Sequence, residues 1–329
     1  MQPDTDLPST GSRTGCYYGQ APMLDIQTQL RHELARAVER HKADAILLSG
    51  GLDTSILAYL ARLSLAFTVS FKDSDAHDLE YAERVADLLS FEHRQREFDE
   101  LEALEVLPHV VGILKTFDPA LPNDLTIYFG LECARQNGVS SVMTGDGADE
   151  LFAGYSYMAQ LAPATLERHL RELPQLWQFS SRLLGKALGI EVKQPFLDRE
   201  FVNFALTIDP QLKMKQGTGK YVLRQAFEGL IPGNILWRDK EPIEVGSGSV
   251  KLRRAMEHMV TDEEFHAAGK ETGIWFMNKE HYFYYRIYRE VVGDIPKAGQ
   301  GEARCPGCGA QMGSRHCRVC GFCRPLEPS

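Results

Sequence analysis

The chain has 329 residues, of which 43% are hydrophobic and 25% charged, and its formal net charge is −9. The hydrophobic content is enough for a substantial core, while the acidic balance argues against wide contact with nucleic-acid phosphates. No apolar run approaches the roughly 20 residues of a membrane span, and no secretory signal is recognisable, so we expect a cytoplasmic protein without membrane association.

Helical patterns alternate with short β-branched or apolar runs as far as Val142. This alternation predicts an α/β fold in which helices sandwich a parallel sheet, followed by a mainly helical second half over 160–290. The expected helices are 24–41, 55–63, 79–89, 100–115 and 124–136, and the expected strands are 44–48, 67–71, 93–98 and 141–143. A ligand site is expected at the carboxyl ends of these strands.

The first informative motif follows the strand at 44–48 and reads Ser-Gly-Gly-Leu-Asp-Thr-Ser over 49–55. Glycines allow a ligand to approach the backbone, and the helix that follows offers unpaired N–H groups to an anion. The hydroxyls of Ser49, Thr54 and Ser55 add donors, and the Asp53 carboxylate suits a magnesium ion. The Walker A lysine is missing. The motif therefore indicates a phosphate-binding loop of another kind, formed by Ser49, Gly50, Gly51, Asp53, Thr54 and Ser55.

A second motif, Thr-Gly-Asp-Gly-Ala-Asp-Glu over 144–150, directly follows the strand at 141–143. Its three acidic residues repel one another unless a cation or a basic group lies among them. Together the two motifs resemble the N-type ATP pyrophosphatases, or PP-loop enzymes, and within them the asparagine synthetase family.

The resemblance continues downstream and spans roughly residues 25 to 290. Residues 191–198 resemble the family's E-x-R-x-P-F-L-D segment, with Lys193 where arginine is usual, and the two side chains are not equivalent in bidentate pairing. Residues 219–224 resemble its G-K-x-x-L-R helix, and Arg238 to Glu241 resemble its R-x-K-E segment. The glycines and serines at 246–249 are typical of a flap that closes over a substrate.

The resemblance implies the adenine nucleotide α-hydrolase-like PP-loop fold and an AMP-forming amide ligase that uses ATP and Mg²⁺. A carboxylate, most simply that of aspartate, is adenylated with release of pyrophosphate and then transferred to ammonia. Asp53 and Asp149 are the implied magnesium ligands, Lys240 and Lys220 the implied catalytic lysines, and Asp146 the residue that handles the incoming amine. Gly145 lies in the nucleotide-binding motif, and Ser70, which ends the second strand, is placed to touch the adenosine.

The opening segment, residues 1–22, is expected to be an extension too short to hold a glutaminase domain. Cys16 within it is read as an ordinary thiol. We therefore expect nitrogen to come from free ammonia, from a separate glutaminase subunit, or from an amine on the substrate itself.

The C-terminal segment contains two C-x-x-C-G knuckles, at Cys305–Cys308 and Cys317–Cys320. Four thiolates at this spacing suit tetrahedral Zn²⁺. The sequence thus divides into an ATP pyrophosphatase domain at 23–295, a linker at 296–302 and a zinc ribbon at 303–325. Cys323 is a fifth candidate, and Cys308, Cys317, Cys320 and Cys323 together resemble the zinc site of 7-cyano-7-deazaguanine synthases.

Two alternatives to asparagine synthesis stay open. The first is an amide ligase, or an amidating or thiolating enzyme, that acts on another carboxylate or a modified base. A zinc ribbon also resembles that of tRNA-thiolating PP-loop proteins, and residues 297–329 carry five basic against two acidic side chains. The second is a non-catalytic nucleotide-binding scaffold, which the presence of Asp53, Asp146, Asp149 and Lys240 argues against.

Overall fold

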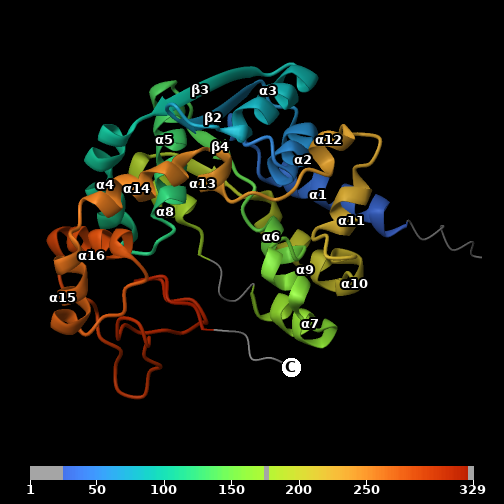
Figure 1. Ribbon diagram of the computed structural model, residues 1–329. Helices are drawn as coiled ribbons and strands as arrows, with labels where there is room; N and C mark the ends of the chain where they lie inside the picture. The colour runs from blue at the N-terminus through green and yellow to red at the C-terminus, as the bar shows by residue number, and fades with distance from the viewer. Residues whose placement is uncertain (1–24, 174–177, 325–329) are drawn as a thin grey trace, which may run out of the picture.

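The computed structural model describes residues 25–173 and 178–324 (Figure 1). The expected N-terminal extension, including Cys16, lies outside these residues, as does the last residue of the expected zinc ribbon. Within them no helix is both long enough and apolar enough to cross a membrane.

Five parallel strands form one sheet in the order β3-β2-β1-β4-β5. They are β1 (Ala45–Leu47), β2 (Leu65–Phe71), β3 (Glu92–Phe98), β4 (Ser141–Met143) and β5 (Glu191–Lys193). The β5 strand was not predicted, because its three residues were assigned only to the motif at 191–198. The chain adds β2 and β3 on one side of β1, and β4 and β5 on the other side. The point between β1 and β4 is therefore a topological switch point, where ligands bind in open α/β sheets.

The helices of the first half follow the expected alternation within a few residues. They are α1 (Ile26–Arg40), α2 (Leu52–Ala61), α3 (His77–Leu89), α4 (Glu100–Leu114), α5 (Leu121–Gln136) and α6 (Ala148–Leu151). The second half is mainly helical, as expected. Its elements are η1 (Ser156–Gln160), α7 (Pro163–Glu172), α8 (Ser180–Leu188), η3 (Pro195–Leu197), α9 (Arg199–Thr207), α10 (Pro210–Lys213), α11 (Tyr221–Ala226), α12 (Gly233–Leu236), α13 (Ile243–Gly246), η4 (Ser249–Lys251), α14 (Leu252–His258), α15 (Asp262–Thr272) and α16 (Lys279–Val291).

Each face of the sheet packs against its own hydrophobic core. On β1, Ala45 belongs to the core that contains α4, α5 and α16, whereas Ile46 belongs to the core that contains α1, α2 and α3. Alternate side chains of a strand point to opposite faces, so a strand covered on both sides is apolar throughout. The predicted helical sandwich around a parallel sheet is therefore confirmed.

The cysteine-rich segment lies beside α15 and α16, at a distance from the sheet (Figure 1). Residues of the segment expected as a linker, 296–302, make backbone contacts with it. Lys297 pairs with Ala310 in a β-bridge, and the N–H of Ala298 donates to the Gly309 carbonyl. Residues of the expected linker thus pair with the first cysteine knuckle.

Candidate active site and cysteine cluster

The first glycine-rich loop connects β1 to the N-terminus of α2. Gly50 has φ +65°, and a Cβ placed on it would lie 2.4 Å from the backbone N of Ala82 in α3. Only glycine fits this close approach. Ser49 and Thr54 brace the loop through a hydroxyl pair 3.1 Å apart. Gly51, the N-cap residue of α2, makes no side-chain capping bond, so the first turn of the helix keeps N–H groups for an anion.

Lys220 joins this loop to the second acidic motif. Its Nζ lies 2.6 Å from Asp53 Oδ2 and 2.8 Å from Asp149 Oδ1. Lys240 donates a hydrogen bond to the other oxygen of Asp149. Two carboxylates and two ammonium groups from four separate segments therefore meet near the switch point of the sheet.

Close backbone contacts leave this cluster no room for larger residues. A Cβ on Gly154 would lie 2.0 Å from Asp149 Oδ1 and 2.3 Å from Lys220 Cε. A Cβ on Gly145 would lie 3.1 Å from Asp53 Cβ, so the second motif passes directly over the first.

The charges in the cluster shift one another strongly. Burial raises the pKa of Asp53 in spite of the opposing Lys220 ammonium. Burial alone would also raise the pKa of Asp149. The ammonium groups of Lys220 and Lys240 outweigh this effect and lower the pKa of Asp149 to about 2. Burial alone would lower the pKa of Lys220, yet Asp149 and Asp53 raise it. Asp149 and Lys220 are thus held in their charged forms.

The donor set also fits a divalent cation. Asp53 Oδ1 is buried and has no hydrogen-bond partner in the part of the chain that the structure describes. A buried oxygen left without a partner is costly unless a ligand occupies it. Carboxylate oxygens from Asp53 and Asp149, supplemented by phosphate oxygens and water, are the ligands that Mg²⁺ prefers.

Two serine hydroxyls that sequence analysis assigned to the nucleotide are equally unpartnered. Ser55 Oγ on α2 and Ser70 Oγ at the end of β2 are buried, and neither makes a hydrogen bond to a described residue. Ser70 lies near the carboxyl end of β2, and Ser55 lies in the first turn of α2. Their roles as ligand contacts stay predictions.

Asp146 lies in a separate polar environment. Its Oδ2 accepts hydrogen bonds from Thr144 Oγ1 (2.7 Å), Ser181 Oγ (2.6 Å) and Gln194 Nε2 (2.8 Å). These three donors fix the carboxylate but do not connect it to Lys220 or Lys240. The structure therefore does not place Asp146 within the lysine–aspartate cluster.

Arg238 is a site residue whose individual role sequence analysis missed. Its guanidinium stacks 4.1 Å from the ring centroid of Tyr81 and lies 2.9 Å from Asp78 Oδ1. Burial raises the pKa of Asp78 to about 6, against the opposing charge of Arg238. Arg238 thereby ties the Lys240 segment to α3, beside the glycine-rich loop. The available signal was its place two residues before Lys240 in the same motif.

A family model described as asparagine synthase matches residues 29–188 and 173–304. The chain belongs to the asparagine synthase family. It is 34% identical to a probable glutamine-hydrolysing asparagine synthetase of Dictyostelium discoideum, over 67% of this chain and 46% of that protein. It is 31% identical to glutamine-hydrolysing asparagine synthetase 1 of Saccharomyces cerevisiae, over 87% of this chain and 63% of that protein. The chain thus spans about half to two thirds of the length of these relatives.

Two solved structures match this chain at much lower sequence identity. NMN synthetase from Francisella tularensis has a TM-score of 0.32 at 15% identity, with 83% of this chain and 96% of that chain covered. The U34-tRNA thiolase NcsA from Methanococcus maripaludis, solved with its [4Fe-4S] cluster, has a TM-score of 0.35 at 14% identity and covers 95% and 97%. Similarity at this level supports no argument about the chain.

The four cysteines of the two C-x-x-C-G knuckles form one cluster. The Sγ atoms of Cys305, Cys308, Cys317 and Cys320 all lie within 4.8 Å of one another. Each knuckle is closed by backbone hydrogen bonds, from Cys305 N to Ala310 O and from Cys317 N to Phe322 O, both 2.8 Å. The exposed Cys323 lies outside the cluster, and every described cysteine is a free thiol.

The cysteine module, residues 303–324, packs against the loop between α4 and α5. The N–H of Phe117 donates to Val319 O at 2.8 Å, and His316 Nε2 lies 2.8 Å from Asp118 Oδ2. Three of the cluster cysteines belong to the same hydrophobic core as the Phe117 ring. The module is therefore built into the domain rather than appended to it.

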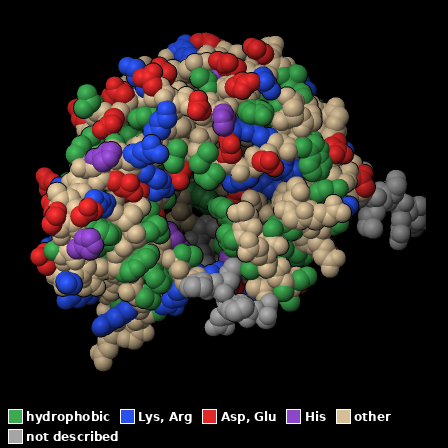
Figure 2. Space-filling model, viewed as in Figure 1, with side chains coloured by type: hydrophobic (Ala, Val, Ile, Leu, Met, Phe, Trp, Pro, Cys, Tyr) green, Lys and Arg blue, Asp and Glu red, His purple; other side chains and the backbone are tan. Residues whose placement is uncertain are grey.

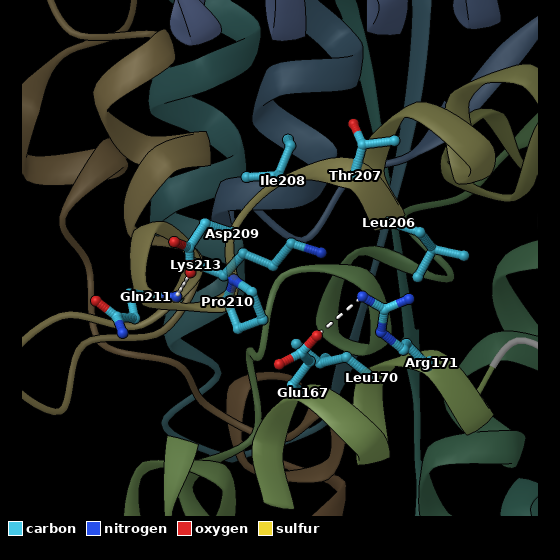
Figure 3. Close-up of a pocket in the computed structure, with 10 residues that line it drawn as sticks. All are labelled: Glu167, Leu170, Arg171, Leu206, Thr207, Ile208, Asp209, Pro210, Gln211 and Lys213. Carbon is cyan, nitrogen blue, oxygen red and sulfur yellow. Dashed lines mark hydrogen bonds and ion pairs between the residues drawn. The ribbon is translucent and has the colours of Figure 1, made fainter. Parts of the chain in front are cut away.

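Two pockets lie outside the lysine–aspartate cluster. The smaller one, of about 330 Å³, lies between α7 and the segment 206–213. Figure 3 shows the Lys213 side chain on the segment 206–213, across from the paired Glu167 and Arg171 on α7. The larger one, of about 1070 Å³, lies between the segment that follows β4 and the cysteine module.

Proposed function

We propose that this chain is an AMP-forming carbon–nitrogen ligase that adenylates a carboxylate and transfers the acyl group to ammonia, with aspartate the first substrate to test. The observation that carries the proposal is the convergence of Lys220, Lys240, Asp53 and Asp149 beside a phosphate-binding loop. Membership of the asparagine synthase family supports ATP as the nucleotide.

In the first step, an oxygen of the substrate carboxylate attacks the α-phosphorus of ATP. A P–O bond forms to the acyl oxygen, the bond to the β-phosphate breaks, and pyrophosphate leaves. The N–H groups of the glycine-rich loop and the hydroxyls of Ser49 and Thr54 hold the pyrophosphate. Asp53 and Asp149 would hold Mg²⁺, which neutralises phosphate charge when bound.

In the second step, ammonia attacks the acyl carbon, and AMP leaves with the former carboxylate oxygen. Negative charge builds on the tetrahedral intermediate, and the Lys240 ammonium stabilises it. Preorganised charge of this kind is usually the largest catalytic contribution. Lys220 keeps Asp53 and Asp149 together before the nucleotide arrives. Asp146, fixed by three donors, orients the incoming amine and accepts its proton.

The test is pyrophosphate release by the purified chain with Mg-ATP and ammonium, with and without aspartate, and with mass detection of AMP and asparagine. Aspartate-dependent release with matching AMP and asparagine supports the proposal in full. Replacing ammonium by glutamine identifies the nitrogen donor. Lys240→Ala should lower turnover about 10²-fold or more, by analogy with the loss of an oxyanion donor. Near-normal turnover in this variant would exclude the assigned role of Lys240.

We also propose Zn²⁺ as the ion of the cysteine cluster. A tetrahedral site with Zn–S bonds of about 2.3 Å has sulfur–sulfur edges of about 3.8 Å. The pairs Cys305–Cys320 and Cys308–Cys317 are 3.6 and 3.7 Å apart, which suits four thiolates on a single ion. A four-iron cluster spreads its thiolates over four metal atoms and needs wider spacing. One zinc per chain without acid-labile sulfide is the expected analysis; iron with sulfide would overturn it.

A further inference from the structure

The larger cavity lies between parts of the chain that are far apart in sequence, and residues 114–124 and 178–183 also line it. One wall comes from the segment after β4 and from α7, and includes Glu150, Tyr155 and Tyr157. The opposite wall comes from the cysteine module and includes Arg315 and His316. Figure 2 shows the face of the molecule hollowed near its centre. At about 1070 Å³, the cavity is at the upper end of the range of about 300–1,000 Å³ for drug-sized ligands.

Tyr155 connects the cavity to the proposed reaction centre, although none of the four cluster residues itself lines the cavity. Lys240 Nζ lies 5.5 Å from the centroid of the Tyr155 ring, and the Tyr155 hydroxyl donates to Glu150 Oε1 at 2.5 Å. Glu150 directly follows Asp149, which Lys240 and Lys220 contact. A ligand in the cavity can therefore place one end near the lysine–aspartate cluster.

The wall that follows β4 is aromatic. The rings of Tyr155 and Tyr157 stack with centroids 5.8 Å apart and planes inclined by 15°. Leu161, Leu173, Phe179 and Leu183 add apolar surface. A wall of this kind suits a flat or extended apolar body.

The charged groups on the cavity, which also include Glu172, Arg318 and Arg324, indicate where an additional anion would bind. Asp118 pairs with His316, Glu150 accepts from Tyr155, and the side chain of Asp124 bonds to Ser180. Arg315 forms no ion pair with a carboxylate in the described ranges 25–173 and 178–324; it donates to the Arg324 carbonyl. Its guanidinium can therefore take a ligand carboxylate in bidentate fashion.

We propose that this cavity is the acyl-substrate site, and that the substrate is a carboxylic acid with an aromatic or extended apolar body and a second anionic group. The reacting carboxylate points to Lys240, the body lies along Tyr155 and Tyr157, and the second anionic group pairs with Arg315. The cysteine module thus supplies one wall of the substrate site. This inference rests on the proposed adenylation chemistry.

The test measures binding to the full metal-loaded chain by calorimetry, with N-benzoyl-L-aspartate, N-benzoylglycine and L-aspartate as probes. N-benzoyl-L-aspartate has an aromatic body and two carboxylates, and it should bind at least tenfold more tightly than L-aspartate. N-benzoylglycine keeps the body but has a single carboxylate, so its affinity should be intermediate. Equal or weaker binding of N-benzoyl-L-aspartate relative to L-aspartate overturns the proposal.

Two variants and one control locate the binding. Leu183 lines the cavity from α8 and is 47% exposed, so Leu183→Trp should fill the cavity and weaken N-benzoyl-L-aspartate at least tenfold. Leu101 on α4 is 77% exposed and does not line the cavity, so Leu101→Trp is the matched control and should bind normally. Arg315→Gln should weaken N-benzoyl-L-aspartate but leave N-benzoylglycine unchanged. Equal effects of the two tryptophan variants, or of Arg315→Gln on both probes, place the probe elsewhere.

Pyrophosphate release separates this inference from the proposed function. If the probes bind in the cavity but no acid supports release, the adenylation proposal falls, and with it the role of the cavity as an acyl site. If aspartate supports release while the Leu183→Trp variant keeps normal activity and the aromatic probe does not bind, the ligase stands and the cavity proposal falls.

Discussion

Lys220 illustrates how one side chain can serve both stability and chemistry. Its side chain is 4% exposed and lies between two carboxylates. Replacing it by methionine leaves Asp53 and Asp149 close together in a buried site without the cation that bridges them, since Lys240 contacts Asp149 and not Asp53. Removing one partner of a buried ion pair costs about 3–5 kcal/mol. We expect Lys220→Met to lower the free energy of unfolding by an amount of this order and to abolish pyrophosphate release.

The response to magnesium separates the structural role of Lys220 from the role of the two carboxylates in binding a cation. The vacated position between Asp53 and Asp149 suits a divalent cation, so millimolar Mg²⁺ should raise the melting temperature of Lys220→Met more than that of the unmodified chain. Lys215, exposed and five residues away, contacts the Tyr221 ring rather than a carboxylate and provides the matched control: Lys215→Met should not change the magnesium dependence of stability by a measurable amount. An identical magnesium response in Lys220→Met and the unmodified chain would argue against Asp53 and Asp149 as cation ligands.

Lys213 presents the opposite case, a buried lysine with no carboxylate partner among the described residues. It is 1% exposed, and its Nζ lies 5.6 Å from the centroid of the Phe152 ring (Figure 3 shows its pocket). Burial lowers the pKa of Lys213 to about 8, and the nearby Arg171 adds to the effect. Keeping it charged at pH 7 opposes folding by at most about 3 kcal/mol, given about 1.4 kcal/mol per pKa unit. Lys213→Met should therefore raise the melting temperature at pH 7.

The sign of its pH dependence follows from proton binding. Between the folded pKa of about 8 and the unfolded value of about 10.4, the unfolded chain binds more protons at Lys213, so its contribution to stability rises with pH. The advantage of Lys213→Met should therefore shrink between pH 8 and pH 10. Melting curves of both proteins across this range test it; a constant difference would show that Lys213 does not titrate with a lowered pKa.

At the scale of elements, the glycine-rich loop depends on its contact with α3. Gly50 and Gly138 both have positive φ, at +65° and +75°, but only Gly50 faces backbone atoms within 4 Å. Gly138→Ala should cost about 1 kcal/mol from conformation alone. Gly50→Ala must in addition displace α3 or the loop, so it should cost more and weaken binding of ATP. Denaturant unfolding and nucleotide titration of the two variants measure the difference, and equal behaviour would contradict the importance of this contact.

The main elements could be predicted because hydrophobic periodicity and glycine positions are local signals. The β1 and β4 strands are short apolar runs followed by glycine motifs, and parallel topology then places both motifs at the same edge of the sheet. The β5 strand could not be found this way, since Glu191 and Lys193 are polar and only pairing with β4 makes the segment a strand. Lys220 was expected to matter from its motif, but its place between Asp53 and Asp149 depends on contacts over 167 and 71 residues of sequence.

At the scale of the whole molecule, cysteine spacing predicted a thiolate cluster but not its place in the fold. The knuckles meet because each carries its own turn and backbone hydrogen bonds. The docking of Val319 on Phe117 and of His316 on Asp118 depends on the shape of the loop before α5, which no local pattern specifies. This docking connects metal binding to the wall of the large cavity. Loss of the metal should therefore lower the local stability of the domain residues that contact the module.

The variants Cys308→Ser and Cys323→Ser, each of which replaces one sulfur atom by oxygen, test this connection. Cys308 belongs to the cluster, whereas Cys323 is exposed and lies outside it. Cys308→Ser should lose the metal and loosen the module, because a structural metal site stabilises the fold that holds it. Hydrogen exchange should then rise at residues 303–324 and at Phe117, whose N–H donates to Val319 in the module. Cys323→Ser should retain the full metal content and normal exchange. Loss of metal in Cys323→Ser, or normal exchange at Phe117 in a metal-free Cys308→Ser, would contradict either the ligand set or the connection between the cluster and the domain.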